Sequence, residues 1–111
     1  HLTEDVPYNA TVVVETEEAA AGWSAPKTSG WLAKAIEKAS LNHFEERDCS
    51  MSEGGTIPFM AMLGEKYPEA QFVITGVLGP NSNAHGPNEF LHIPYAKKLT
   101  CCIASIINDF K

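Results

Sequence analysis

The segment best suited to chemistry is an irregular run, residues 76–89, that contains His85. The run is rich in Gly, Pro and Asn, so it is not expected to form a helix or a strand. It follows an apolar segment, and α/β proteins place functional groups in loops at the carboxyl ends of strands. His85 stands between small residues, which would leave its imidazole accessible as a zinc ligand, with Glu89 or a backbone carbonyl accepting the other ring N–H. Taken alone, however, the run fits a surface histidine without a ligand better.

A second segment, composed of Glu53, Gly54, Gly55 and Thr56, has the composition of an anion-binding turn. The two glycines let backbone N–H groups approach a ligand closely. Pro58 then suits the first turn of a helix, whose N-terminus favours a carboxylate. The Thr56 hydroxyl could add one hydrogen bond. By itself, a capped helix start with a glycine turn explains the segment better.

Other candidate groups are weaker. Glu17-Glu18 and Glu45-Glu46 are carboxylate pairs of the kind used in acid/base catalysis. Both pairs lie at the ends of expected elements, where solvated charges are common, so a surface role is favoured. The sequence contains no Ser-His-Asp order, no P-loop and no dinucleotide-binding fingerprint.

The elements that would position these groups alternate between strand and helix patterns. β-Branched residues predict a strand at 11–14, and an apolar run predicts a buried strand at 70–75. Helical spacing predicts helices at residues 29 to about 44, 58 to about 65, and from 94 onward, with His43 packed on the first. This order indicates an α/β fold, with a partial mixed sheet covered by helices. Two strands are few for a sheet, so the others are expected outside this chain.

Composition limits the classes of partner and compartment. With 111 residues, 44% of them hydrophobic and 20% charged, the chain fits one globular domain or part of one. The net charge of -6 and the scattered lysines argue against a nucleic acid partner. No run approaches the roughly 20 apolar residues of a membrane span. Three cysteines, an odd number with the adjacent Cys101 and Cys102 facing different directions on a helix, predict reduced thiols and a cytoplasmic protein.

Taken in order, three segments carry a resemblance that none carries alone. They are Glu-Gly-Gly-Thr-Ile-Pro at 53–58, Gln-Phe-Val-Ile-Thr-Gly-Val-Leu-Gly-Pro at 71–80, and Asn-Ala-His-Gly-Pro-Asn-Glu at 83–89. Together they closely resemble the dizinc metallopeptidase family M-twenty, which includes carnosinases, cytosolic dipeptidases, aminoacylases and succinyl-diaminopimelate desuccinylases. The resemblance covers nearly the whole chain, from about Val6 onward.

The resemblance implies two domains, a catalytic α/β domain and a smaller lid domain that often dimerises. Residues 1–17 would be the last strand of the lid or dimerisation domain, and residues 18–111 the C-terminal part of the zinc-peptidase catalytic domain. His85 would be the last protein ligand of a centre with two zinc ions. The substrate carboxylate would lie on Gly54, Gly55 and Thr56. The residues that would support the His85 loop are Asn83, Asn88 and Glu89.

The implied activity is that of a zinc-dependent peptidase or amidohydrolase, of dipeptidase, carboxypeptidase or aminoacylase type. In such enzymes two zinc ions polarise the scissile carbonyl and activate water, and a glutamate moves the proton. The family's other ligands and its general base lie upstream of this chain, so the chain alone is expected to be inactive. Its partners would be the missing N-terminal part of the catalytic domain and, in the parent enzyme, a small peptide or N-acyl amino acid.

An alternative from another class is a non-catalytic interaction domain. An exposed sheet edge and apolar surface would favour self-association, with a homo-oligomer as the outcome.

Overall fold

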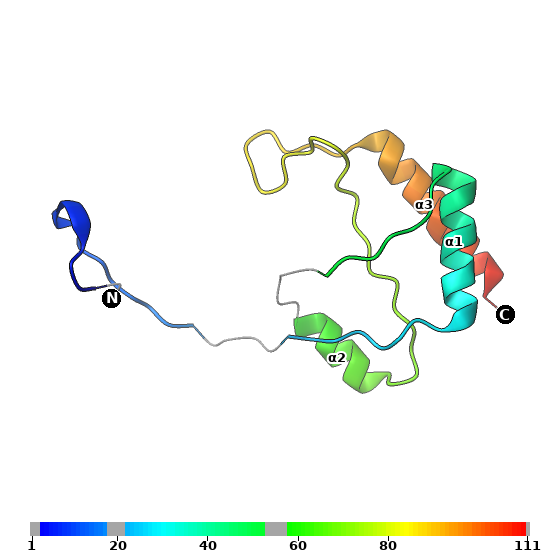
Figure 1. Cartoon of the computed structure of the whole chain (residues 1–111), viewed down its shortest axis with the longest axis horizontal. Coiled ribbons are helices and arrows are strands. Elements are labelled where there is room, and N and C mark those ends of the chain that lie inside the picture. The colour runs from blue at the N-terminus through cyan, green and yellow to red at the C-terminus, as the bar shows by residue number, and fades with distance from the viewer. Residues whose placement is uncertain (1–2, 18–21, 53–57, 111) are drawn as a thin grey trace.

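Three α-helices and one short 3-10 turn make up the regular structure of the described residues. The computed structural model describes residues 3–17, 22–52 and 58–110. Within these ranges the elements are η1 (Pro7–Asn9), α1 (Gly30–Phe44), α2 (Pro58–Lys66) and α3 (Ile93–Asp109). Figure 1 shows α1 crossing α3 obliquely, while the N-terminal arm runs away from the helices.

Helix α1 lies where the sequence predicts it. Ser29 occupies the N-cap position, but its side chain makes no capping hydrogen bond. Its backbone N–H instead donates to Oε1 of Gln71 at 2.6 Å, which ties the start of the helix to a distant segment. The helix ends at Glu45, whose left-handed backbone (φ 63°) lets its N–H donate to the carbonyl of Leu41.

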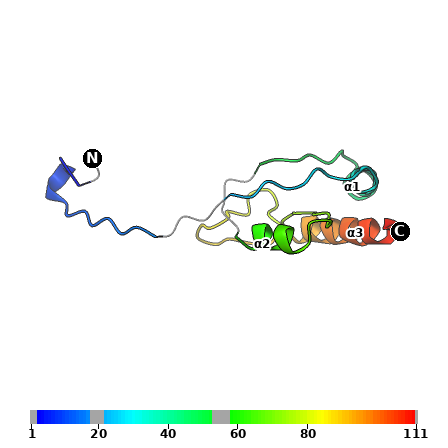
Figure 2. The same cartoon turned by 90° about the horizontal axis from the view of Figure 1, so that it is seen from below.

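The core lies between α1 and α3. Leu32 is only 2% exposed, and it packs with Ala35 and Ala39 of α1 against Cys102 and Ile106 of α3. The two alanines let the helix backbones approach closely, while the larger side chains supply most of the buried apolar area. Figure 2 shows the helices in adjacent layers, with α1 seen end-on beside α3. The residues that pack against the edge of this core are Ile36, Phe44 and Ile103.

The predicted α/β fold with a partial mixed sheet is wrong. The described residues contain helices and irregular segments, and residues 11–14 and 70–75 are not strands. A strand obtains its hydrogen bonds from a neighbouring strand, whereas a helix closes its own within each turn. In the described part of the chain, neither segment has a partner strand, so their β-branched and apolar residues do not become a sheet.

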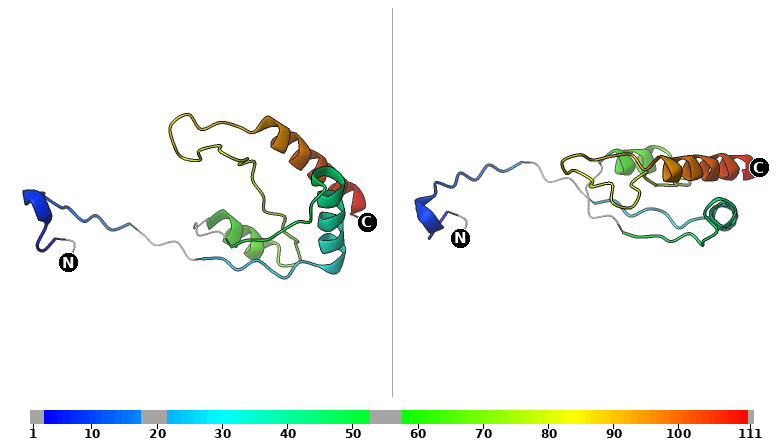
Figure 3. Two further views of the ribbon diagram at one scale, coloured as in Figure 1. Left: turned by 45° about the horizontal axis from the view of Figure 1, so that its top comes forward. Right: turned by 90° about the horizontal axis from the view of Figure 1, so that it is seen from above.

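Outside the α1–α3 pair, aromatic contacts connect the irregular segments to one another and to α2. The ring of Trp23 meets Phe72 edge-to-face at 5.0 Å between centroids, and its indole nitrogen lies beside Gly64 of α2. The Cα radius of gyration is 19.7 Å, compared with about 13 Å for a compact domain of this length. The extended N-terminal arm in Figure 3 accounts for part of this difference.

The described helices are also too short or too polar for a bilayer: none could cross a membrane.

Candidate functional site

The segment around His85 forms a loop that is closed by its own hydrogen bonds. We call residues 79–90 the His85 loop. The backbone N–H of Phe90 donates to the carbonyl of Ser82 at 3.2 Å, and that of Ser82 donates to the carbonyl of Gly79 at 3.3 Å. Ser82 is 3% exposed, so it anchors the base of the loop. The loop itself, yellow in Figure 1, projects away from the helix pair.

Asn83 closes the tip of this loop. Its Nδ2 donates to the carbonyl of Pro87 at 2.7 Å, and its own carbonyl accepts the N–H of Gly86 at 2.9 Å. A Cβ atom on Gly86 would lie 2.6 Å from that same Nδ2. A residue with a side chain at position 86 would therefore displace the Asn83 amide, and this contact explains the glycine.

Left-handed backbone is concentrated in the same loop. Asn81, Asn83, His85 and Asn88 have φ values of 62°, 53°, 59° and 59°. Asparagine tolerates this conformation well, whereas a histidine there is unusual and carries a cost of about 1 kcal/mol or more. The conformation persists because the surrounding hydrogen bonds hold it. Such strained positions concentrate at ligand-binding sites, which makes His85 the residue of interest.

Glu89 holds His85, but by a different atom from the one expected. Its Oε2 accepts the backbone N–H of His85 at 3.0 Å, not a ring N–H. Across the described ranges, neither ring nitrogen of His85 has a hydrogen-bond partner. The residue as a whole is exposed to solvent.

Asn88 plays a smaller part in the described loop. It contributes a left-handed turn, and its amide makes no hydrogen bond to any described residue. Gly54, Gly55 and Thr56, the predicted carboxylate-binding residues, lie outside the described residues, as does Glu18.

The described donor set does not suffice for zinc. Structural and catalytic zinc sites need three or four protein ligands. In the described part of the chain, no three His, Cys, Asp or Glu side chains gather where they could hold a metal ion. His85 contributes one imidazole, so these residues do not fit a zinc centre by themselves.

The two other histidines in the described part of the chain have structural partners. Nε2 of His43 lies 2.9 Å from Oγ of Ser105, which joins α1 to α3. Nδ1 of His92 accepts the backbone N–H of Tyr95 at 3.1 Å and so caps α3. Because the two residues lie on different helices, the pair connects α1 to α3. Sequence reasoning missed both contacts, and only the His92-Ile-Pro94 order hinted at the cap.

The cysteines are free thiols, as predicted. Burial raises the pKa of the Cys102 thiol, and the neighbouring Cys101 raises it further. A thiol held protonated in this way is a poor nucleophile and a poor metal ligand. Cys102 instead donates its S–H to the carbonyl of Ala39 at 3.4 Å, within the core.

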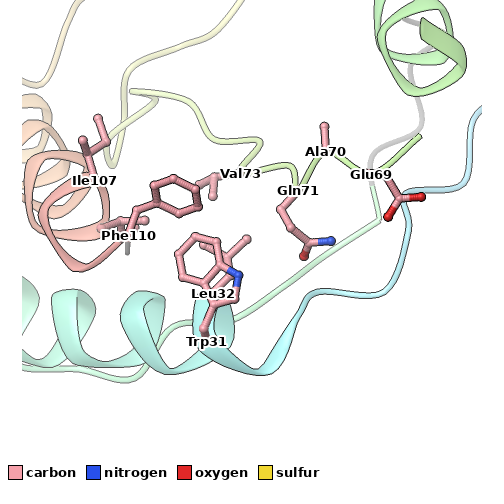
Figure 4. Close-up of a pocket in the computed structure, with 9 residues that line it drawn as sticks. Trp31, Leu32, Glu69, Ala70, Gln71, Val73, Ile107 and Phe110 are labelled. Carbon is pink, nitrogen blue, oxygen red and sulfur yellow. The ribbon is translucent and has the colours of Figure 1, made fainter. Parts of the chain in front are cut away.

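Two pockets of the described structure lie away from the His85 loop. Figure 4 shows an open apolar pocket of about 480 Å³, where the ring of Trp31 tilts against Phe110 at 5.2 Å. Leu32 also lines this pocket, together with the polar residues Glu69 and Gln71. A second pocket, of about 440 Å³, lies between α1, α3 and residues 46–50. Neither pocket includes a residue of the His85 loop.

Comparison of the chain with protein-family models and with characterised proteins finds no match.

Proposed function

We propose that this chain is the C-terminal part of a zinc-dependent peptidase or amidohydrolase of the dizinc family that it resembles. In this role His85 supplies one ligand to a centre of two zinc ions, and the remaining ligands come from another part of the parent protein. Gly54, Gly55 and Thr56 receive the carboxylate end of a dipeptide or N-acyl amino acid. The chain alone does not hydrolyse these substrates.

One observation carries the proposal: His85 is exposed on a loop braced in an uncommon backbone conformation. Residues held in uncommon backbone conformations cluster at functional sites, and this tendency supports a role for His85. The support for the glycine turn comes from the sequence alone. The three free thiols agree with a reducing, cytoplasmic location.

The test is to extend the chain with the sequence encoded upstream of His1 and to measure bound zinc by atomic emission. The extended protein should bind two zinc ions and release amino acids from dipeptides or N-acyl amino acids. His85→Asn, which keeps a residue tolerant of left-handed backbone, should lose zinc, while Ser105→Ala should keep it. An upstream sequence without acidic and histidine ligands, or a folded extended protein without zinc, would refute the proposal.

A second candidate function is self-association as a non-catalytic interaction domain. Apolar side chains of both expected strands remain exposed: Val13 is 77% exposed, Ile74 58% and Val73 40%. Exposed apolar surface of this kind marks interaction sites. Light scattering at increasing concentration decides the matter, since a monomer at high concentration would exclude a homo-oligomer.

A further inference from the structure

Residues 83–89 hold the backbone of His85 through hydrogen bonds in which side chains of the loop contact backbone atoms. Glu89 is the one charged residue among them. Its carboxylate reaches back four positions to the His85 N–H. Asn83 closes the same turn from the other side, through Pro87 and Gly86. Neither contact uses the ring, so the loop fixes the His85 Cα–Cβ direction and leaves both ring nitrogens available.

We propose that Glu89 is a positioning residue for His85: its carboxylate holds the His85 backbone N–H, maintains the left-handed conformation there, and so aims a free imidazole out of the loop. A charged acceptor makes a shorter and stronger hydrogen bond to an N–H than a neutral one does. The carboxylate thereby offsets the cost of φ 59° at a histidine. This inference rests on the proposed function only for the ligand, zinc, that the His85 ring then binds.

The geometry distinguishes this role from the usual way in which a carboxylate orients a metal-bound histidine. Outer carboxylates commonly accept the second ring N–H of a metal-bound histidine. Glu89 is occupied by the backbone instead, so it acts on the position of the ring and not on its tautomer. A shorter or uncharged acceptor should keep part of this effect, and a side chain without an acceptor should keep none.

Amide hydrogen exchange of the ¹⁵N-labelled chain tests the contact directly. Glu89→Ala should speed exchange at the His85 N–H by about tenfold, since one hydrogen bond is worth about 1.4 kcal/mol or slightly less. Glu89→Gln, which keeps an amide oxygen, should restore part of the protection. The one-bond Cα–Hα coupling of His85 should report a change in the sign of φ in Glu89→Ala alone. Glu69→Ala, an exposed glutamate in another segment, is the matched control.

Unchanged exchange and an unchanged φ at His85 in Glu89→Ala would overturn the positioning role. In the extended parent protein, Glu89→Ala should weaken zinc binding by about 10- to 100-fold, with rescue by Gln. A wild-type parent that binds no zinc, with the amide result intact, would refute the proposed function and leave the hold of Glu89 on the loop established.

Discussion

His43 of α1 and Ser105 of α3 join the two helices through a hydrogen bond of 2.9 Å between Nε2 and Oγ. The bond lies beside the apolar core and joins residues 62 positions apart in the sequence. A hydrogen bond requires a particular geometry, whereas apolar contacts do not, so this bond helps to fix how the two helices pack. Lys38, in the middle of α1, and Asp109, the last residue of α3, add an exposed ion pair with a shortest N–O distance of 2.8 Å. Such an exposed pair contributes little to stability, so the buried and half-buried contacts matter more.

Ser105→Ala should lower the free energy of unfolding by about 1 kcal/mol, because it removes the partner of a half-buried His43 nitrogen. Thr100→Ala is the matched control on the same helix, since the Thr100 hydroxyl donates only within α3, to the carbonyl of Ala96. Urea titration followed by circular dichroism measures both. Equal losses in the two variants would show that the contact between helices adds nothing.

Leu32→Ala should cost about 2–5 kcal/mol, because Leu32 is the most buried large side chain of a five-residue core. Leu41→Ala on the same helix should cost less than about 1 kcal/mol, because Leu41 is 44% exposed. The same substitution thus tests burial with helix propensity held constant. If the midpoint temperature of thermal unfolding fell equally in both variants, the core would not lie between α1 and α3.

The Cys102 thiol should make stability depend on pH in the alkaline range. Its pKa in the folded chain is raised above the ordinary value of 9.0, so the unfolded chain loses the proton more readily. The free energy of unfolding should therefore be constant below that ordinary value and fall as pH rises from there through the raised pKa. Cys102→Ala should abolish this fall, whereas Cys101→Ala should retain most of it, since burial is the larger cause.

Urea titrations at several pH values between 7 and 10 check this dependence. Alkylation by iodoacetamide supplies a second measurement: exposed Cys49 and Cys101 should react well before Cys102. A Cys102 that reacted as fast as the others would contradict its burial.

Gly79→Ala should disturb the base of the His85 loop. A Cβ atom at Gly79 would overlap Cβ of His92, and this atom cannot swing aside as the end of a flexible side chain can. Displacing His92 would remove the cap on the Tyr95 N–H, at a cost of about 1 kcal/mol from helix α3. Gly76→Ala is the matched control, since no atom lies within 4 Å of a Cβ there.

Backbone amide exchange at Tyr95 measures this effect. We expect the Tyr95 N–H to exchange faster in Gly79→Ala than in the unmodified chain, and at an unchanged rate in Gly76→Ala. Similar behaviour of the two variants would mean that Gly79 does not support the cap.

The sequence by itself determined the helices, because their hydrogen bonds and apolar periodicity are local. The helix predicted at residues 29–44 was confirmed as Gly30–Phe44, and Pro58 and Pro94 marked the starts of the other two to within a residue. Composition also determined that residues 76–89 would be irregular. Strand propensity at 11–14 and 70–75 led to a wrong fold class, because a sheet depends on partners that propensity does not supply.

Only the tertiary structure decided how the irregular residues are held. The sequence suggested Glu89 or a backbone carbonyl as acceptor of a His85 ring N–H, whereas in the structure Glu89 accepts the backbone N–H of His85. Periodicity carries no information about how a loop is closed. Likewise, Ser105 reads as an ordinary helix residue until α1 brings His43 beside it. Contacts between distant segments depend on how helices pack, and local residue types do not encode that packing.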